Sequence, residues 1–546
     1  MADDTSMADS TTGDETTGGE TTGEDLPDGN ARFIVGERVL TETDNLTRPH
    51  LLTYAQGGVV SLVELVPELP ENASVIWADV VDQGLTLVYC TAAPGDAAHP
   101  CEVRDLRSDP PGPATSLAVT PVPAGATLQY PEWVASTSSF LFSAATLDGS
   151  ASGIYLAPAA DGIVGAPVPL VVSGPGERVS SGFSVDHDGS RIGYLRMPEG
   201  GPPEAWIAPA NPPDPMTAVR ISAPVDPMQQ LHVPQFVPGL DAMIYVVDSD
   251  EPANPLALSL WLVDVSTPMP GTPVRLDDPL AAPLQIRRPS IASDGHALVY
   301  YLGAEGELMG ELMLVDLGGG APAPPIRVST PSDSGVEVTD WGWSPDGRWI
   351  AYMGRHEGPE QTDVYVVDAS STPPGDPVRV SEGLIDGGEM MIWRFDADGH
   401  WLYMFGQIDA ERPGLFRVDV SGDTPGAPER VGDPATWADE ELVFSSTGTK
   451  LLHAAFSGSP SVRQLALADV SGAEVGVSTI INDALGRDVD VGYGPQFSRD
   501  ESVVAYRESG PGFDAPQLLH LVDLTTLDVV EVDIDTKWIT AAADLP

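Results

Sequence analysis

The sequence has very few lysines and no long apolar run, and each shortage excludes a class of protein. Lys450 and Lys537 are its two lysines, and basic residues number 26 in all against 81 acidic ones, which gives a formal net charge of −55. A field of that sign repels nucleic-acid phosphates and anionic lipids, so neither is expected as a partner. No apolar run approaches the roughly 20 residues that cross a bilayer, so no transmembrane segment is predicted.

The motifs of many enzymes and metal proteins are missing too. The sequence has no GxxxxGK[ST] loop and no CxxC pair, and its nine histidines show no HxH or HExxH spacing. We therefore predict no catalytic residue, no cofactor and no metal ligand. One alternative stays open: Asp186-x-Asp188 and Asp396-x-Asp398 resemble fragments of calcium loops, although the distal glutamate of a complete loop is missing. A weak surface calcium site is that alternative.

The two cysteines, Cys90 and Cys101, are separated by ten residues, and a β-type stretch flanks each of them. We predict a disulfide that closes this loop and stabilises the fold by about 2–3 kcal/mol. Such a bond implies an oxidising, extracytoplasmic compartment. Two unpaired buried thiols are the alternative.

Residues 1–30 differ in composition from the rest of the chain. They contain nine acidic residues, no basic one, and the triplet TTG repeated every five residues. Such a segment cannot bury enough apolar surface to offset the entropy of ordering it, so it is predicted to be disordered. It resembles the acidic Thr/Gly spacers of bacterial surface lipoproteins. The resemblance implies a tether to a lipid-bearing cysteine that this sequence does not contain.

A repeat of about 52 residues occupies most of the chain. Its best copy is WGWSPDGRWIAYMG, from Trp341 to Gly354, and other copies align on an apolar anchor residue. The nine anchors are Val80, Trp133, Val185, Phe236, Ile291, Trp343, Phe395, Phe444 and Phe497. This regular spacing indicates that the chain repeats one supersecondary unit many times.

Each copy has the pattern of a β-hairpin. An Asp-Gly pair supplies the turn, because glycine tolerates the positive φ that such turns need. These structural turns are Asp188-Gly189, Asp294-Gly295, Asp346-Gly347 and Asp398-Gly399. Alternate apolar residues follow on one strand, and then a second apolar run ends in aspartate. A fourth, Pro/Gly-flanked element completes four short strands.

An arginine in that fourth element follows the aspartate by 11 residues in four successive copies. The pairs are Asp264 with Arg275, Asp316 with Arg327, Asp368 with Arg379, and Asp419 with Arg430. The constant interval leads us to the hypothesis that each pair meets across the third and fourth strands and fixes their register.

Four short antiparallel strands per repeat predict an all-β protein of the β-propeller class. The segment SPDGRWIAY closely resembles the WD40-like (PD40) repeat of TolB-like propellers. We expect residues 31–546 to form a single ring of about nine blades, within a range of eight to ten. A degenerate copy at 50–65 is a possible tenth, and strand-like residues 32–40 are expected to help close the ring. Two smaller rings are the alternative.

Gly342-Trp343-Ser344 looks at first like a hydrolase nucleophile motif. A nucleophile elbow needs a second glycine where Asp346 stands, and a helix after it, so Ser344 is interpreted as a turn residue. The resemblance to TolB-like proteins implies a non-catalytic, monomeric module that binds an envelope protein or a small ligand in the periplasm or at the cell surface. The alternative is a propeller hydrolase or lyase with a polar site in the central channel.

Overall fold

The structure is a computed structural model, and its described part is built almost entirely of β-strands. It describes residues 31–541 except 41–44, 56–57, 68, 70–72, 94–98, 109–110, 130, 161–162, 212, 214–216, 227–228, 252–253, 278–283, 305–309, 319–321, 331–337, 357–360, 383–388, 408–412, 433–436, 458–461, 473–476, 483–489 and 510–516. The predicted tether therefore lies outside the described residues. Within them the one helix is a 3₁₀ turn, Ala135–Thr137, and none has the length and apolar character to span a bilayer.

The strands form nine antiparallel sheets in the part of the chain that is described. The six four-stranded sheets are β4 (Ser74–Val81), β5 (Thr86–Ala92), β6 (Cys101–Asp105) and β7 (Thr115–Ser116); β14 (Glu177–Val185), β15 (Arg191–Pro198), β16 (Glu204–Pro209) and β17 (Val219–Arg220); β23 (Leu284–Ile291), β24 (Ala297–Ala304), β25 (Gly310–Asp316) and β26 (Ile326–Arg327); β27 (Val338–Trp343), β28 (Trp349–Gly354), β29 (Asp363–Asp368) and β30 (Val378–Arg379); β31 (Met390–Phe395), β32 (Trp401–Gly406), β33 (Gly414–Asp419) and β34 (Glu429–Val431); and β35 (Trp437–Phe444), β36 (Lys450–Ser457), β37 (Val462–Asp469) and β38 (Thr479–Ile480).

Two further sheets have the same plan with one or two extra short strands. The six-stranded sheet contains β8 (Thr127–Leu128), β9 (Glu132–Val134), β10 (Ser139–Ala145), β11 (Ser152–Ala160), β12 (Ile163–Val164) and β13 (Val168–Val172). The five-stranded sheet contains β18 (Gln230–Leu231), β19 (Gln235–Phe236), β20 (Ala242–Glu251), β21 (Asn254–Asp264) and β22 (Val274–Arg275).

The ninth sheet joins the two ends of the described chain. Its eight strands are β1 (Ala31–Leu40), β2 (Asn45–Ala55), β3 (Gly58–Glu64), β39 (Asp490–Val491), β40 (Gln496–Phe497), β41 (Val503–Ser509), β42 (Gln517–Asp523) and β43 (Val529–Ala541). The long strand β43 pairs with β42 through its first half and with β1 through its second half.

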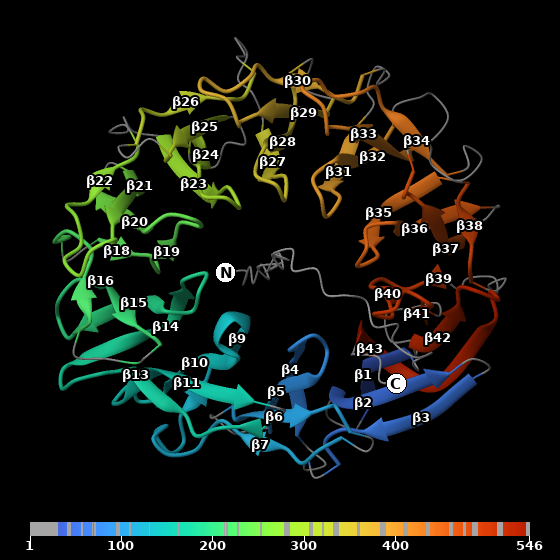
Figure 1. Cartoon of the computed structure of the whole chain (residues 1–546), viewed down its shortest axis with the longest axis horizontal. Helices are drawn as coiled ribbons and strands as arrows, with labels where there is room; N and C mark the ends of the chain where they lie inside the picture. The colour runs from blue at the N-terminus through green and yellow to red at the C-terminus, as the bar shows by residue number, and fades with distance from the viewer. Residues whose placement is uncertain are drawn as a thin grey trace.

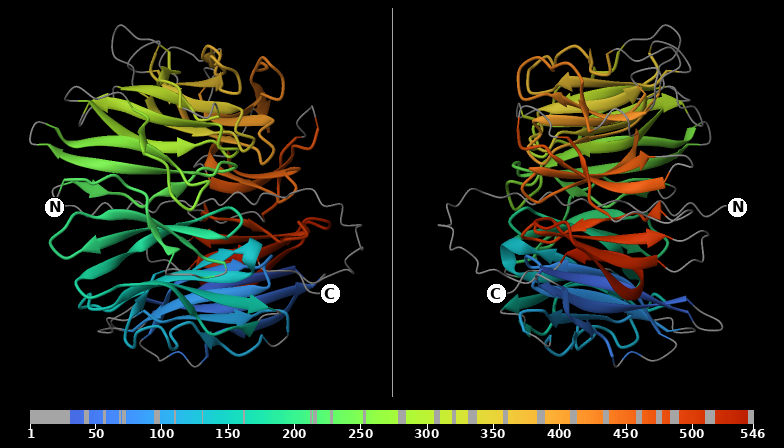
Figure 2. Two further views of the ribbon diagram at one scale, coloured as in Figure 1. Left: turned by 60° about the vertical axis from the view of Figure 1, so that its left-hand side comes forward. Right: turned by 90° about the vertical axis from the view of Figure 1, so that its right-hand side faces the viewer.

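The sheets follow one another around a centre in chain order (Figure 1) and stack face to face in side view (Figure 2). From the centre outwards we call the four strands of a sheet inner, second, third and outer. We call the end that carries the inner–second connections, such as 186–190 and 344–348, the turn face. The opposite end, with second–third connections such as 146–151 and 199–203, is the loop face.

The core lies between neighbouring sheets, because both faces of each sheet are covered. One hydrophobic cluster, for example, joins Tyr301 and Leu314 of one sheet to Ile350 and Tyr352 of the next. A buried tyrosine recurs in the second strand, at 2% exposure or less: Tyr89, Tyr194, Tyr245, Tyr300, Tyr352, Tyr403 and Tyr506. Each such side chain contributes about 1.5–3 kcal/mol by burial, so the repeated pattern supplies the main driving force for stacking.

The Asp-Gly pairs lie in the turns between inner and second strands. Gly189, Gly295, Gly347 and Gly399 have φ values of 70°, 71°, 72° and 71°. At Gly347 a Cβ would also lie 3.2 Å from Oδ1 of Asp294, in the turn of the preceding sheet. Ser344 is 1% exposed, and its hydroxyl donates to Asp346 and accepts the Trp349 N–H. Ser344 is therefore tied into the turn, and neither of these two hydrogen bonds involves a histidine.

The hypothesis that the recurring aspartates pair with arginines 11 residues later is wrong. Each aspartate accepts a backbone N–H two residues further on, as Asp264 does from Ser266 at 2.8 Å. Arg327 instead pairs with Glu311 at 2.8 Å, and Arg379 with Asp363 at 2.8 Å. The register explains this: Arg327 lies opposite Met313, three residues before Asp316, and an odd offset places a side chain on the other face of the sheet.

Cys90 and Cys101 form the predicted disulfide. They lie directly opposite each other on β5 and β6, and they are 1% and 0% exposed. The bond lies in the hydrophobic cluster between this sheet and the next, so it is shielded from solvent reductants.

Candidate functional site

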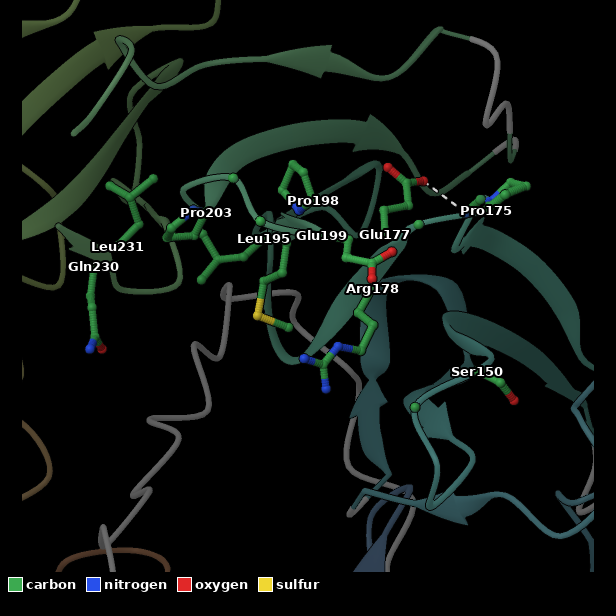
Figure 3. A pocket seen from close by; sticks show the side chains of 16 residues that line it. Ser150, Pro175, Glu177, Arg178, Leu195, Pro198, Glu199, Pro203, Gln230 and Leu231 are labelled. Carbon is green, nitrogen blue, oxygen red and sulfur yellow. Dashed lines mark hydrogen bonds between the residues drawn. The ribbon is translucent and has the colours of Figure 1, made fainter. Parts of the chain in front are cut away.

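The loop face contains a cavity of about 720 Å³ that three consecutive sheets line. Its residues come from the β10–β11 connection, from the segment Gly174–Arg178 that leads into β14, from the β15–β16 connection, and from β18. A volume of this size is typical of sites for small ligands or short peptide segments. Figure 3 shows the lining side chains.

The hairpins of the two sheets next to the cavity differ in length. Tyr194 pairs with Trp206, and the equivalent pair in the next sheet is Tyr245 with Trp261. The chain between the partners is therefore four residues shorter in the first hairpin. Gln230 and Leu231 of β18, in the next sheet, flank the hollow beside the β15–β16 connection.

Hydrogen bonds fix the segment that enters β14. The carboxylate of Glu177 accepts the Gly174 N–H at 2.8 Å and an Arg196 N–H at 3.0 Å (Figure 3 shows the first). The backbone N–H of Glu199 donates to the Gly176 carbonyl at 2.6 Å. The charge of Glu177 is thus compensated, and the two connections are held together at the cavity.

Arg178 and Glu199 differ from Glu177 because their charges are not compensated. Both side chains are exposed and line the cavity, and neither has a hydrogen-bond or ion-pair partner among the described residues. At Gly149 a Cβ would lie 3.1 Å from Cδ of Arg178, so a glycine there leaves room for the arginine. Arg178 and Glu199 border the same hollow in Figure 3.

The rest of the lining is partly apolar. Leu195 and Leu231 are each 6% exposed, and Met197 is half-buried. The cavity therefore combines an aliphatic floor with one free cation and one free anion, a mixture that favours an amphipathic ligand.

The lining residues do not form a catalytic pair. They include no histidine or cysteine. Their one hydroxyl, on Ser150, donates to Asp148, and hydrogen bonds from the Ser150 backbone and side chain and from Thr146 lower the pKa of Asp148 to about 2. So weak a base does not activate a hydroxyl at neutral pH. This geometry supports binding.

Two carboxylates with raised pKa values lie elsewhere, on the inner strands nearest the centre. Desolvation by surrounding atoms raises the pKa of Asp79 on β4, where a hydrogen bond from the Val80 N–H partly opposes it, and it also raises the pKa of Glu132 on β9, although both side chains are solvent-exposed. Raised carboxyl pKa values are a property of general acids. Within the described chain, Asp79 and Glu132 are therefore the residues that we consider for the alternative of a propeller enzyme.

The other site residues considered from the sequence lie on the turn face. Asp186, His187 and Asp188 bring their ligand atoms within 4.8 Å of one another. Asp186, however, is 6% exposed and already pairs with Arg191. In Asp396 burial raises the pKa above its usual range, and its carboxylate accepts the Trp401 N–H at 3.0 Å. Both acids thus form hydrogen bonds or ion pairs within their own turns, and a weak calcium site there stays the alternative to the prediction of no metal ligand.

Sequence reasoning missed the cavity. Arg178 and Glu199 are ordinary surface residues in the one-dimensional pattern, and no motif marks them. The one available signal was the unequal hairpin lengths, which the alignment of tyrosine and tryptophan positions contains.

No family model and no curated protein matches the chain. Solved structures similar to it include a prolyl endopeptidase at 15% identity and a TM-score of 0.35, with 70% of this chain and 53% of that one covered. An oligogalacturonate lyase in complex with manganese has 11% identity and a TM-score of 0.37, with coverages of 71% and 97%. TolB from Acinetobacter baumannii has 15% identity and a TM-score of 0.26, with coverages of 64% and 82%.

These likenesses concern the fold alone. The chain spans about half of that prolyl endopeptidase, 53% of its length. The similar proteins include enzymes as well as TolB, so they favour neither of the two functions considered from the sequence. The class that the sheets define is an all-β, propeller-like protein of repeated antiparallel sheets.

Proposed function

We propose that the chain is a non-catalytic β-propeller that binds a protein partner or small ligand through its loop face, outside the cytoplasm at the cell envelope. The observation that supports this proposal is the cavity beside β14 and β15. It offers uncompensated charge and aliphatic surface, while its hydroxyl and carboxylates lack the geometry of a nucleophile with its base.

We further propose that the chain is one closed, monomeric ring. Counted as two four-stranded units that share β43, the eight-stranded sheet brings the number of blades to ten, within the expected range of eight to ten. Pairing of β1 with β43 supports closure. A single species of 57.4 kDa in light scattering is the expected result for the monomer.

The extracytoplasmic location is part of the proposal. The buried disulfide Cys90–Cys101 supports an oxidising compartment, since disulfides are rare in the reducing cytosol. The lipid anchor, for which residues 1–30 would be the tether, remains a proposal that rests on composition.

Binding by the loop face is tested by capture from a cell-envelope extract, followed by reconstitution with the purified partner. Gln230→Trp fills the cavity from an exposed position and should weaken the reconstituted complex at least tenfold. Arg499→Gln, in an exposed turn on the opposite face, is the control and should leave binding unchanged. If both variants bind the partner equally well, the loop face is not the binding surface.

An enzyme is the second candidate, and Asp79 and Glu132 are the observation that favours it. Glycoside hydrolysis uses a pair of carboxyl groups, one of them an acid whose pKa is raised. A panel of chromogenic glycosides and uronate oligosaccharides is the test. Turnover that Asp79→Asn or Glu132→Gln abolishes, without loss of the folded state, would replace the binding proposal with this one.

A further inference from the structure

The cavity's two free charges have opposite sign and line the same hollow. Arg178 and Glu199 are both exposed and line the same cavity, yet no salt bridge between them is found among the described residues. A ligand with only one charge would leave the other uncompensated. A ligand with both an ammonium and a carboxylate group matches both.

The apolar floor narrows the ligand class further. Leu195, Met197 and Leu231 offer aliphatic and thioether surface, and none of the described lining residues is aromatic. Sugars usually bind against aromatic faces, while aliphatic side chains bury well against leucine and methionine. The exposed amide of Gln230 adds a donor and an acceptor that suit a peptide group.

We infer that the cavity binds a zwitterionic ligand of the amino-acid type: a short peptide, or a free amino acid, with aliphatic side chains. Arg178 binds the carboxylate, Glu199 binds the ammonium group, and the aliphatic side chain lies on Leu195, Met197 and Leu231. This inference rests on the proposed binding function and names its ligand.

The chain's own charge bears on selectivity. With a formal net charge of −55, the protein repels simple anions. A carboxylate therefore reaches Arg178 most favourably when the same ligand carries a positive charge. The cavity should accordingly reject peptides that have lost their ammonium group more strongly than the contact with Glu199 alone would require.

Isothermal titration calorimetry with tri-leucine, N-acetyl-tri-leucine, tri-leucine amide and leucine tests the inference. For the wild type we expect tri-leucine to bind and each cap to weaken binding about tenfold or more, the usual scale of one charge-assisted hydrogen bond. Leucine that binds as well as tri-leucine identifies an amino-acid site, and weaker leucine binding identifies a peptide site.

Two variants assign the contacts. Arg178→Gln should weaken tri-leucine about tenfold and abolish discrimination against the amide, while still rejecting the N-acetyl form. Glu199→Gln should do the reverse. The matched controls, Arg499→Gln on the turn face and Glu531→Gln on β43, alter equally exposed charges that have no partner among the described residues, and they should behave as the wild type.

Equal affinity for capped and uncapped peptides would overturn the inference. So would the absence of binding heat for all four ligands at concentrations up to about 10 mM, roughly the weakest affinity that is useful. If no peptide binds but Gln230→Trp still weakens binding of the envelope partner, the proposed binding function is supported and only the proposed ligand class is wrong. If tri-leucine binds and mass spectrometry detects its cleavage, the ligand class stands and the non-catalytic proposal falls.

Discussion

Arg38 and Asp535 lie 497 residues apart in the chain, and Nε of the arginine is 2.8 Å from Oδ2 of the aspartate. The arginine belongs to β1 and the aspartate to β43, at the junction where β43 passes from β42 to β1. Asp535 also accepts the Gln517 N–H at 2.8 Å. One carboxylate thus connects the first strand of the described chain to the last two.

This pair should measurably stabilise the junction. The side chains are 11% and 20% exposed, so solvent screens the pair less than a surface pair. We expect Arg38→Gln and Asp535→Asn each to lower the free energy of unfolding by about 1–2 kcal/mol, with a coupling energy near 1 kcal/mol in a double-mutant cycle. Urea denaturation of the four proteins is the measurement. Strictly additive effects would show that the contact does not hold the ends together.

Loss of the disulfide should destabilise the protein through the unfolded state. The bond closes a loop with a sequence separation of 11, and Cys90→Ala/Cys101→Ala should cost about 2–3 kcal/mol in urea. The wild type unfolded under strong reductant should show the same loss. Because both sulfurs are buried, reductant should leave the folded wild type oxidised for hours. Rapid thiol labelling of the native protein would contradict this placement.

Gly347 should be intolerant of a side chain. Its φ is 72°, and a Cβ would meet Asp294 Oδ1 and Ser293 Oγ at 3.2 Å. We expect Gly347→Ala to lower stability by about 1–2 kcal/mol. The matched control is Gly375→Ala, whose Cβ would make ordinary contacts at 3.6 Å and whose φ is not positive. Similar melting temperatures for the two variants would show that the turn does not depend on glycine.

Glu501 should make stability depend on pH. Burial raises its pKa, but hydrogen bonds from Thr447, Ser446 and Lys450 together outweigh burial and leave the pKa below the usual 4.5. A lowered folded-state pKa contributes stability above the unfolded value, and that stability is lost as the pH falls through the folded value. The wild type should therefore weaken below about pH 4.5 through this group.

Glu501→Gln separates that effect from general acid sensitivity. It should cost about 1–2 kcal/mol at pH 7, because it removes charge-assisted bonds between neighbouring turns. The difference in unfolding free energy between this variant and the wild type should shrink as the pH falls from about 5 to about 3, the range in which carboxyl groups titrate. Glu531→Gln, an exposed residue on β43, should match the wild type throughout. A pH-independent difference would rule out titration of Glu501 as the cause.

Much of the fold follows from short-range patterns. Repeated Asp-Gly turns, alternating apolar residues and an aromatic in the second strand specify four short antiparallel strands, because each feature acts over fewer than about ten residues. The cysteine pair belongs to the same category, since both cysteines lie on one hairpin. The Asp–Arg hypothesis was wrong because an interval in sequence does not give the face of a strand: Arg327 lies opposite Met313 and pairs with Glu311.

The sequence by itself determined the all-β class, the repeat, its turns and the disulfide, since these depend on residues close together in the chain. The sequence also led us to expect that residues 32–40 help close the ring. Tertiary structure alone decided that the strand beside β1 is β43, that Arg38 meets Asp535, and that Arg178 and Glu199 face one cavity. Those relationships join separate hairpins or the two ends of the chain. They depend on how the sheets stack, which no local pattern encodes.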